Sequence, residues 1–246
     1  MKDNKTAYSL FLEDEKEIFK DIEIIKHIPH SSLEFPDDYD DSALKMIYGV
    51  DYKTQNLKLA DLFVDYLFKD IKGIEIKAKY SRMYCDVEKY KDDKKEIMAQ
   101  YGLGYIYIKN IFNNKPYFRN LIYKGEDLSK DIEIYYDKHH ERLTNEIKRI
   151  ISQGKKALIL DLHSFSDEQA TLIGKRGPFP DICIGINNNQ VDGRILTAII
   201  KRIKAKGYSY KINYPYKGAI IPNNLTAKEK KCVCSIMIEV NKRIYL

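Results

Sequence analysis

Short runs rich in β-branched residues alternate along this chain with longer amphipathic stretches, and this alternation limits the folds that the chain can adopt. The runs at 22–28, 155–160, 181–186 and 233–238 predict strands that are buried within a sheet. Strands that alternate with helices favour a largely parallel sheet covered by helices. We therefore expect the α/β class, as a three-layer α/β/α sandwich with a mixed, largely parallel central sheet.

The amphipathic stretches predict helices at three places. Apolar residues at spacings of three and four run from Thr54, a candidate N-cap, to Leu67. A second helix is expected from about Asp137. A third carries the apolar stripe of 195–203 and ends at Gly207, because glycine readily adopts the left-handed conformation that stops a helix.

The chain between these elements is less regular. The runs at 74–78 and 83–87 predict two further strands. Residues 91–130 contain Gly and Asn patterns typical of loops, and we interpret this segment as an insertion near the functional site. Repeats, low-complexity tracts and Pro/Gly-rich linkers are not visible, so residues 1–246 are expected to form one domain.

The composition limits the classes of partner. Lys and Arg number 42 against 36 Asp and Glu, and the resulting charge of +6 is spread along the sequence. Such diffuse basicity does not indicate a nucleic-acid groove, and no apolar stretch is long enough to span a membrane. The N-terminal segment does not resemble a signal peptide. The four cysteines lie in apolar runs without a CxxC pair, so we expect a cytoplasmic protein.

Two histidines and a glutamate stand where strands of the expected sheet end. His30, His163 and Glu239 each come directly after an apolar run, and the carboxyl ends of parallel strands gather active-site residues. Zinc hydrolases bind the metal through His and carboxylate ligands, and a nearby carboxylate acts as the base. Each of these residues also has a structural interpretation, and His27, within a predicted strand, is interpreted as structural or exposed. The residues alone leave both interpretations open.

A series of short segments extends these observations over most of the chain. The segments are Ile28-Pro-His-Ser-Ser32, 51–57, Ser81-Arg-Met-Tyr-Cys-Asp86, 135–140, Leu160-Asp-Leu-His-Ser164, 180–185, Asn213-Tyr-Pro-Tyr-Lys-Gly218 and 237–245. In their order and in their polar residues they resemble the N-formylglutamate amidohydrolase family. That resemblance implies a phosphorylase/hydrolase-like sandwich, related in plan to the zinc carboxypeptidases.

The resemblance also implies a metal centre and a base. His30 and His163 would bind one zinc ion, and Glu239 would be the general base. For the third ligand, Asp51 is the first choice and Glu34 the reserve, while other divalent metals could replace zinc.

Further residues are expected around that centre. Arg82 would be a second catalytic residue and would bind a substrate carboxylate or carbonyl, since a guanidinium suits either group. Asp161 and Ser164 would support His163. The remaining pocket residues implied by the resemblance are Asp86, His140, Asn213 and Tyr216.

Four positions depart from the family pattern: Gln55, Glu88, Lys89 and Ala219. Because Lys does not replace Arg at a bidentate site, we expect hydrolysis of an amide in a small N-acyl amino acid without fixing the acyl group. The partner would be this small molecule, with no nucleic acid and no membrane. Two alternatives are a peptidase or cell-wall amidase on the same scaffold, and an inactive relative that binds a ligand.

Overall fold

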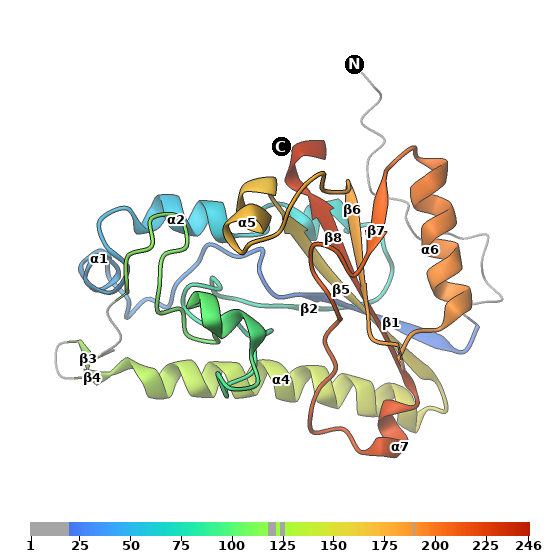
Figure 1. The fold of residues 1–246 in the computed structure, drawn as a ribbon. Helices are drawn as coiled ribbons and strands as arrows, with labels where there is room; N and C mark the ends of the chain where they lie inside the picture. The colour runs from blue at the N-terminus through green and yellow to red at the C-terminus, as the bar shows by residue number, and fades with distance from the viewer. Residues whose placement is uncertain (1–19, 118–121, 124–125, 189) are drawn as a thin grey trace. The chain divides into compact units, whose positions relative to one another are not determined.

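The computed structural model describes residues 20–117, 122–123, 126–188 and 190–246 (Figure 1). The chain divides into two compact units, and each is described here by itself. Unit 1 comprises the described residues of Met1–Ile28, Phe63–Lys77 and Arg142–Leu246. Unit 2 comprises those of Pro29–Leu62 and Ala78–Glu141. The expectation of one domain over 1–246 stays a prediction, and the segment examined for a signal peptide lies outside the described residues up to residue 19.

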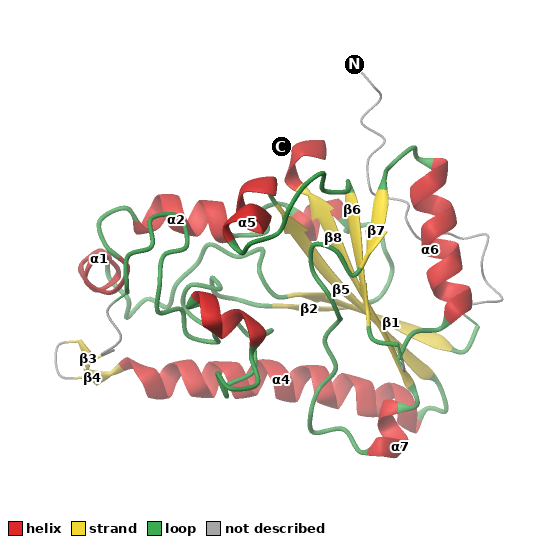
Figure 2. Ribbon diagram, in the orientation of Figure 1, coloured by secondary structure: helices red, strands yellow, loops and turns green. Residues whose placement is uncertain are grey.

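Unit 1 is built on a six-stranded sheet, drawn in yellow in Figure 2, with the strand order β2-β1-β5-β8-β6-β7. Four strand pairs of the described sheet are parallel, and the β6–β8 pair is antiparallel. This mixed, mostly parallel arrangement confirms the predicted sheet. The strands are β1 (Ile22–Ile28), β2 (Ile74–Lys77), β5 (Lys156–Phe165), β6 (Ile182–Ile186), β7 (Tyr210–Ile212) and β8 (Val233–Asn241).

Helices pack on both faces of this sheet, as the α/β/α sandwich requires. Successive strand residues point to opposite faces, so Leu158 and Leu160 of β5 join one core with α3 and α6, while Ile159 joins another with α4. These contacts confirm the three-layer α/β class. The helices with residues in unit 1 are α3 (Val64–Leu67), α4 (Leu128–Ser152, from Arg142 onward), α5 (Asp167–Leu172), α6 (Gly193–Ala205), α7 (Ala227–Lys230) and η4 (Lys242–Ile244).

The same alternation gathers polar side chains on the α4 face of the sheet. On β5, Asp161 and His163 continue the series that begins with Ile159. The strand register then sets their neighbours, because His27 of β1 pairs with Asp161 and Glu239 of β8 pairs with His163. The sheet itself therefore brings these polar residues together.

Unit 2 has an aromatic core in place of a large sheet. Tyr39 and Tyr84 meet edge to face at 5.0 Å between ring centroids, and Tyr48 and Tyr117 do so at 5.1 Å. Edge-to-face rings are favourable because the positive ring edge meets a negative ring face. The elements are α1 (Asp41–Tyr48), α2 (Tyr52–Leu59), η3 (Ile97–Tyr101), β3 (Ile122–Tyr123), β4 (Glu126–Asp127) and the part of α4 up to Glu141.

The prediction of one helix from Thr54 to Leu67 is wrong. Helix α2 begins earlier, with Asp51 at its N-cap, and the backbone turns extended at Ala60 (ψ 145°). Phe63 then takes the left-handed conformation (φ 61°), so that α3 starts as a separate turn of helix. The apolar spacing continued across this break, and periodicity alone could not reveal it.

Two other boundaries also differ from the sequence analysis. Residues 83–87 form turns rather than a strand, because the amides of Tyr84 and Cys85 donate to the Ser81 carbonyl. Helix α4 starts at Leu128 rather than near Asp137. The predicted β1 is confirmed, as is the stop of α6 near Gly207 (φ 76°).

The segment 91–130 is only partly described, because residues 118–121 and 124–125 lie outside the described residues. Its described part carries η3 and adds Leu103, Tyr107 and Tyr117 to the core of unit 2. The interpretation of this segment as an insertion near the site stays a prediction.

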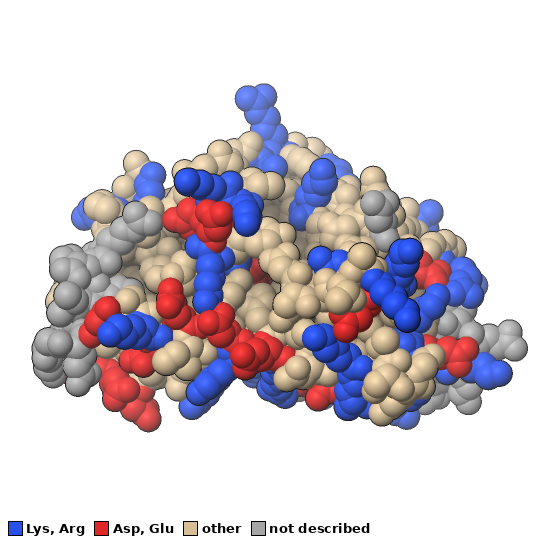
Figure 3. All heavy atoms as spheres, turned by 90° about the horizontal axis from the view of Figure 1, so that it is seen from below, with Lys and Arg blue, Asp and Glu red and all other residues tan. Residues whose placement is uncertain are grey.

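The surface in Figure 3 carries charges of both signs. Described Lys and Arg side chains on this face are interspersed with Asp and Glu. The expectation of no nucleic-acid partner stays a prediction. Among the helices of the described residues, none is both long and apolar enough to cross a membrane.

Gly185 in β6 lies where other parts of unit 1 pack closely against the backbone. A Cβ at this position would lie 2.0 Å from the Gly218 carbonyl oxygen and 2.4 Å from Cε of Met237. We expect Gly185→Ala to lower the free energy of unfolding by about 2 kcal/mol or more, because overpacking displaces backbone. Urea denaturation measures this loss. Gly193→Ala is the control, since a Cβ there meets nothing within 4 Å, and equal losses for the two variants would contradict the close contact.

Candidate metal centre

His30 of unit 2 is surrounded by carboxylates. Its Nε2 lies 2.8 Å from Oδ1 of Asp86 and 3.8 Å from Oε2 of Glu88, and its Nδ1 lies 3.5 Å from Oδ2 of Asp61. The Asp61 amide also donates to the His30 carbonyl at 2.9 Å. His30 follows β1 directly, so the strand end and these contacts fix both its backbone and its ring.

Asp86 contacts the charged and polar side chains around His30 in unit 2. Its Oδ2 accepts hydrogen bonds from Nη2 of Arg82 at 3.0 Å and from the Tyr107 hydroxyl at 2.7 Å. Burial alone would raise the pKa of Asp86, but the charges of His30 and Arg82 lower it well below the usual value of an aspartate. Asp86 therefore stays ionised while buried, because its neighbours compensate the lost hydration.

In unit 1, one carboxylate oxygen joins two histidines. Oδ1 of Asp161 lies 2.7 Å from Nδ1 of His27 and 3.0 Å from Nε2 of His163, and Oδ2 accepts from the Ile220 amide at 3.1 Å. An ionised carboxylate can only accept, so both contacting ring nitrogens carry hydrogen. Neutral His163 then bears its lone pair on Nδ1, the nitrogen suited to bind a metal.

Glu239 stands beside His163 on the neighbouring strand. The two residues pair in the parallel register of β5 and β8, and Glu239 is 7% exposed. On its other side it pairs with Cys183 of β6. Burial, with a smaller effect of Glu239, raises the pKa of the Cys183 thiol to about 12. The thiol therefore stays neutral and adds no second negative charge beside the glutamate.

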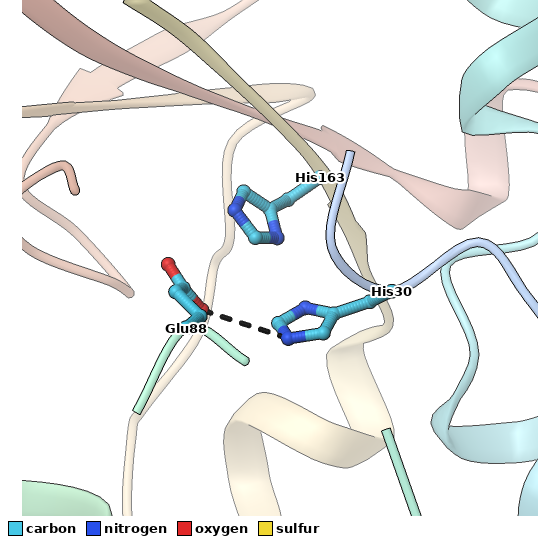
Figure 4. Close-up of side chains that lie close together, drawn as sticks. All are labelled: His30, Glu88 and His163. Atoms are coloured by element: carbon cyan, nitrogen blue, oxygen red, sulfur yellow. Dashed lines mark ion pairs between the residues drawn. The ribbon is translucent and has the colours of Figure 1, made fainter. Parts of the chain in front are cut away.

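Within unit 2, His30 and Glu88 are two side chains that could hold a metal ion. Figure 4 marks their ion pair, in which Oε2 of Glu88 lies 3.8 Å from Nε2 of His30. Imidazole and carboxylate are donors that zinc uses in hydrolases, and other divalent metals accept them too. The buried carboxylates of Asp61 and Asp86 add negative charge near His30. The donor chemistry therefore fits a divalent cation.

Comparisons with known proteins identify the family of this chain and agree with its fold. A sequence model of the N-formylglutamate amidohydrolase family matches residues 22–246. The chain belongs to this family. An N-formylglutamate deformylase of Pseudomonas putida is 25% identical over 225 residues, which cover 89% of this chain and 80% of that protein. The resemblance seen in the short segments is thereby confirmed, and the chain is a member of an amide-hydrolysing enzyme family.

Two solved structures share the fold. The crystal structure of N-formylglutamate amidohydrolase from Ralstonia eutropha JMP134 has a TM-score of 0.68 and 20% identity, over 91% of this chain and 83% of that one. That of a gene product from Agrobacterium tumefaciens has a TM-score of 0.56 and 16% identity, over 91% of this chain and 81% of that one. At such identities the likeness speaks for the fold alone.

Both residues predicted as the third ligand lie on the surface of unit 2, and their role as a ligand stays a prediction. Asp51 is exposed at the start of α2, and its Oδ1 accepts from Nε2 of Gln55 at 2.6 Å. Glu34 is also exposed. The carboxylate of Glu88, which we did not predict as a ligand, lies 3.8 Å from Nε2 of His30. Within the family pattern Glu88 had looked like a departure in a substrate contact, so its position near His30 was missed.

The residues predicted to bind substrate are held by protein contacts. Nε and Nη2 of Arg82 donate to Asp86. Asn213 (φ 55°) accepts from the amides of Ile186 and Gly218, and so fixes the loop after β7. The Tyr216 ring packs edge to face on Phe165. Their contacts with a substrate stay predictions, as does that of His140.

Asp161 and Ser164 were predicted to support His163, and other neighbours of the site were not predicted. Asp161 contacts the ring, as a supporting carboxylate would. The buried Ser164 hydroxyl has no hydrogen-bond partner among the described atoms, and its support of His163 stays a prediction. His27 and Asp61 were missed as neighbours of the site, although the strand alternation of 22–28 puts His27 on the same face as Ile25.

The contact of His27 with Asp161 can be tested through stability. His27→Leu removes an N–H donor from a fully buried carboxylate. We expect the free energy of unfolding to fall by about 1–3 kcal/mol, the usual cost of an unmet buried hydrogen bond. His27→Asn should lose less, because its amide nitrogen can replace Nδ1. Urea unfolding of metal-free protein measures both losses, and equal values would contradict this geometry.

Proposed function

We propose that this chain is a zinc-dependent amidohydrolase that acts on a small N-acyl amino acid, with N-formylglutamate as the first compound to test. Family membership supports the hydrolysis of an amide. The buried His30, with Glu88 and two further carboxylates beside its ring, is the observation that carries the metal dependence. The names of the relatives support a formyl group on glutamate.

In this proposal His30, Glu88 and His163 would hold one zinc ion. When bound, zinc would lower the pKa of a water ligand to about 7 and polarise the substrate carbonyl. Asp161 keeps hydrogen on Nε2 of His163, so the lone pair for a metal would be that of Nδ1. Asp61 contacts Nδ1 of His30, which would favour ligation through Nε2. Arg82 and Tyr107 would then remain to hold the Asp86 carboxylate.

Glu239 is the general base of the proposal. Its carboxylate takes a proton from the attacking water and returns it to the amide nitrogen as the C–N bond breaks. The products are a carboxylic acid and a free amine. The register that pairs Glu239 with His163 supports this role, since base and metal ligand then share one face of the sheet.

The surroundings of the reaction also belong to the proposal. The substrate is a small molecule, and Arg82, Asp86, His140, Asn213 and Tyr216 are the residues proposed to bind it. The four free cysteines of the described chain support a reducing, cytoplasmic location.

Glu88→Gln tests the ligand set. Removing a charged ligand should weaken zinc binding by about 100-fold or more, since even the loss of an outer partner costs 10–100-fold. Competition with a chromophoric chelator measures the affinity. Asp51→Asn is the matched control and should keep the wild-type affinity. The reverse result, with Asp51→Asn weak and Glu88→Gln unchanged, would restore Asp51 as the third ligand.

Glu239→Gln tests the base. We expect zinc to remain bound while kcat on N-formylglutamate falls by about 10²–10⁴-fold, the usual contribution of general acid–base catalysis. Release of formate and of free glutamate measures turnover. Activity on acyl dipeptides alone would indicate the peptidase alternative. Folded wild type that refuses zinc and binds a ligand without consuming it would indicate an inactive relative.

A further inference from the structure

Glu88 lies in a short segment without regular secondary structure. Residues 86–89 form turns and belong to no helix or strand of the structure. Within this stretch, the Glu88 amide donates to Oδ1 of Asp86 at 3.2 Å, and the Lys89 amide donates to the Asp86 carbonyl at 3.2 Å. A side chain in such a turn needs support from a rigid element to keep a fixed position.

Helix α4 supplies that support on both sides of Glu88. Nε2 of His140 lies 2.7 Å from the carbonyl oxygen of Val87. The Tyr136 hydroxyl donates to the carbonyl oxygen of Lys89 at 2.6 Å. The carbonyl before Glu88 and the carbonyl after it are therefore both bound by one helix.

Tyr136 and His140 lie side by side on one face of α4. Positions i and i+4 are neighbours on the surface of a helix, and the rings of Tyr136 and His140 lie 4.3 Å apart between centroids. Tyr136 is 8% exposed, so water competes weakly for its hydrogen bond. We call Tyr136 and His140 together the α4 clamp.

We propose that the α4 clamp positions Glu88 for metal binding, so that Tyr136 and His140 act as positioning residues. This inference rests on the proposed role of Glu88 as a ligand. For His140 it adds a task to the proposed substrate contact, since only its Nε2 binds the Val87 carbonyl.

The chemistry of each bond shows which replacements keep the clamp. A carbonyl oxygen only accepts, so Nε2 of His140 must carry the hydrogen. The amide nitrogen of Gln lies about where Nε2 of His does, whereas Leu offers no donor. Phe in place of Tyr136 keeps the ring and removes only the hydroxyl.

The helix also offers a matched control. Tyr135 lies next to Tyr136, and its hydroxyl accepts a hydrogen bond from the Tyr80 amide at 3.1 Å. Tyr135→Phe therefore removes one hydroxyl-to-backbone bond from the same helix, but away from Glu88. The two variants differ in which stretch of backbone loses its bond.

The first experiment measures amide hydrogen exchange in the metal-free protein. Tyr136→Phe should speed exchange of the Glu88 and Lys89 amides roughly fivefold, because one hydrogen bond contributes about 1 kcal/mol to holding the segment. Tyr135→Phe should leave these two amides unchanged. Equal exchange rates of the Glu88 and Lys89 amides in both variants would contradict the proposed clamp, whether or not the protein binds zinc.

The second experiment measures zinc affinity by chelator competition. Tyr136→Phe and His140→Leu should each bind zinc roughly 10-fold more weakly, in the range found for lost outer partners. Tyr135→Phe should match wild type, and His140→Gln should recover most of the affinity. Faster exchange without any loss of affinity would overturn the positioning of Glu88. Wild type that binds no zinc would instead contradict the proposed function, and the exchange rates would still decide whether α4 holds this turn.

Discussion

The pairing of β5 with β8 is the constraint on which the candidate site of unit 1 depends. The register runs from Ala157 and Val233 to Phe165 and Asn241, so both strands continue through residues that sequence patterns treat as loop. Because parallel partners in register share a face, His163 and Glu239 cannot separate without breaking the ladder. A hydrogen-bonded backbone thus fixes the distance between the proposed ligand and the proposed base more firmly than a loop could.

In unit 2 the corresponding constraint is the buried carboxylate of Asp86, which needs compensating contacts. Asp86 is fully buried, and such a carboxylate is stable only when neighbouring groups compensate it. Arg82, Tyr107 and His30 provide that compensation through direct contacts. If His30 turns to a metal, the bonds from Arg82 and Tyr107 keep Asp86 satisfied. The hydrogen bond from Arg82 to Asp86 is therefore part of what would let His30 serve as a ligand.

The sequence predicted the sheet and the position of His30 and His163 near the ends of its strands, because both depend on local patterns. Apolar runs of β-branched residues mark buried strands, and His30 and His163 stand at or near their ends. Glu88 could not be found in this way, since it lies in a turn and meets His30 only through folding. The break between α2 and α3 was missed for a related reason, because the left-handed Phe63 carries no mark in the spacing of apolar residues.

The position of Glu88 changes the meaning of the departures from the family pattern. At the level of sequence, an acid at this position suggested a lost substrate contact and hence an inactive relative. An acid 3.8 Å from a buried imidazole is chemically suited to be a second donor to a cation, which supports the proposed metal centre. The neighbouring departure compensates this acid, because Nζ of Lys89 lies 3.3 Å from Oε2 of Glu88. The two departures therefore form an ion pair with each other, and a changed acid at Glu88 is not by itself an argument for an inactive relative.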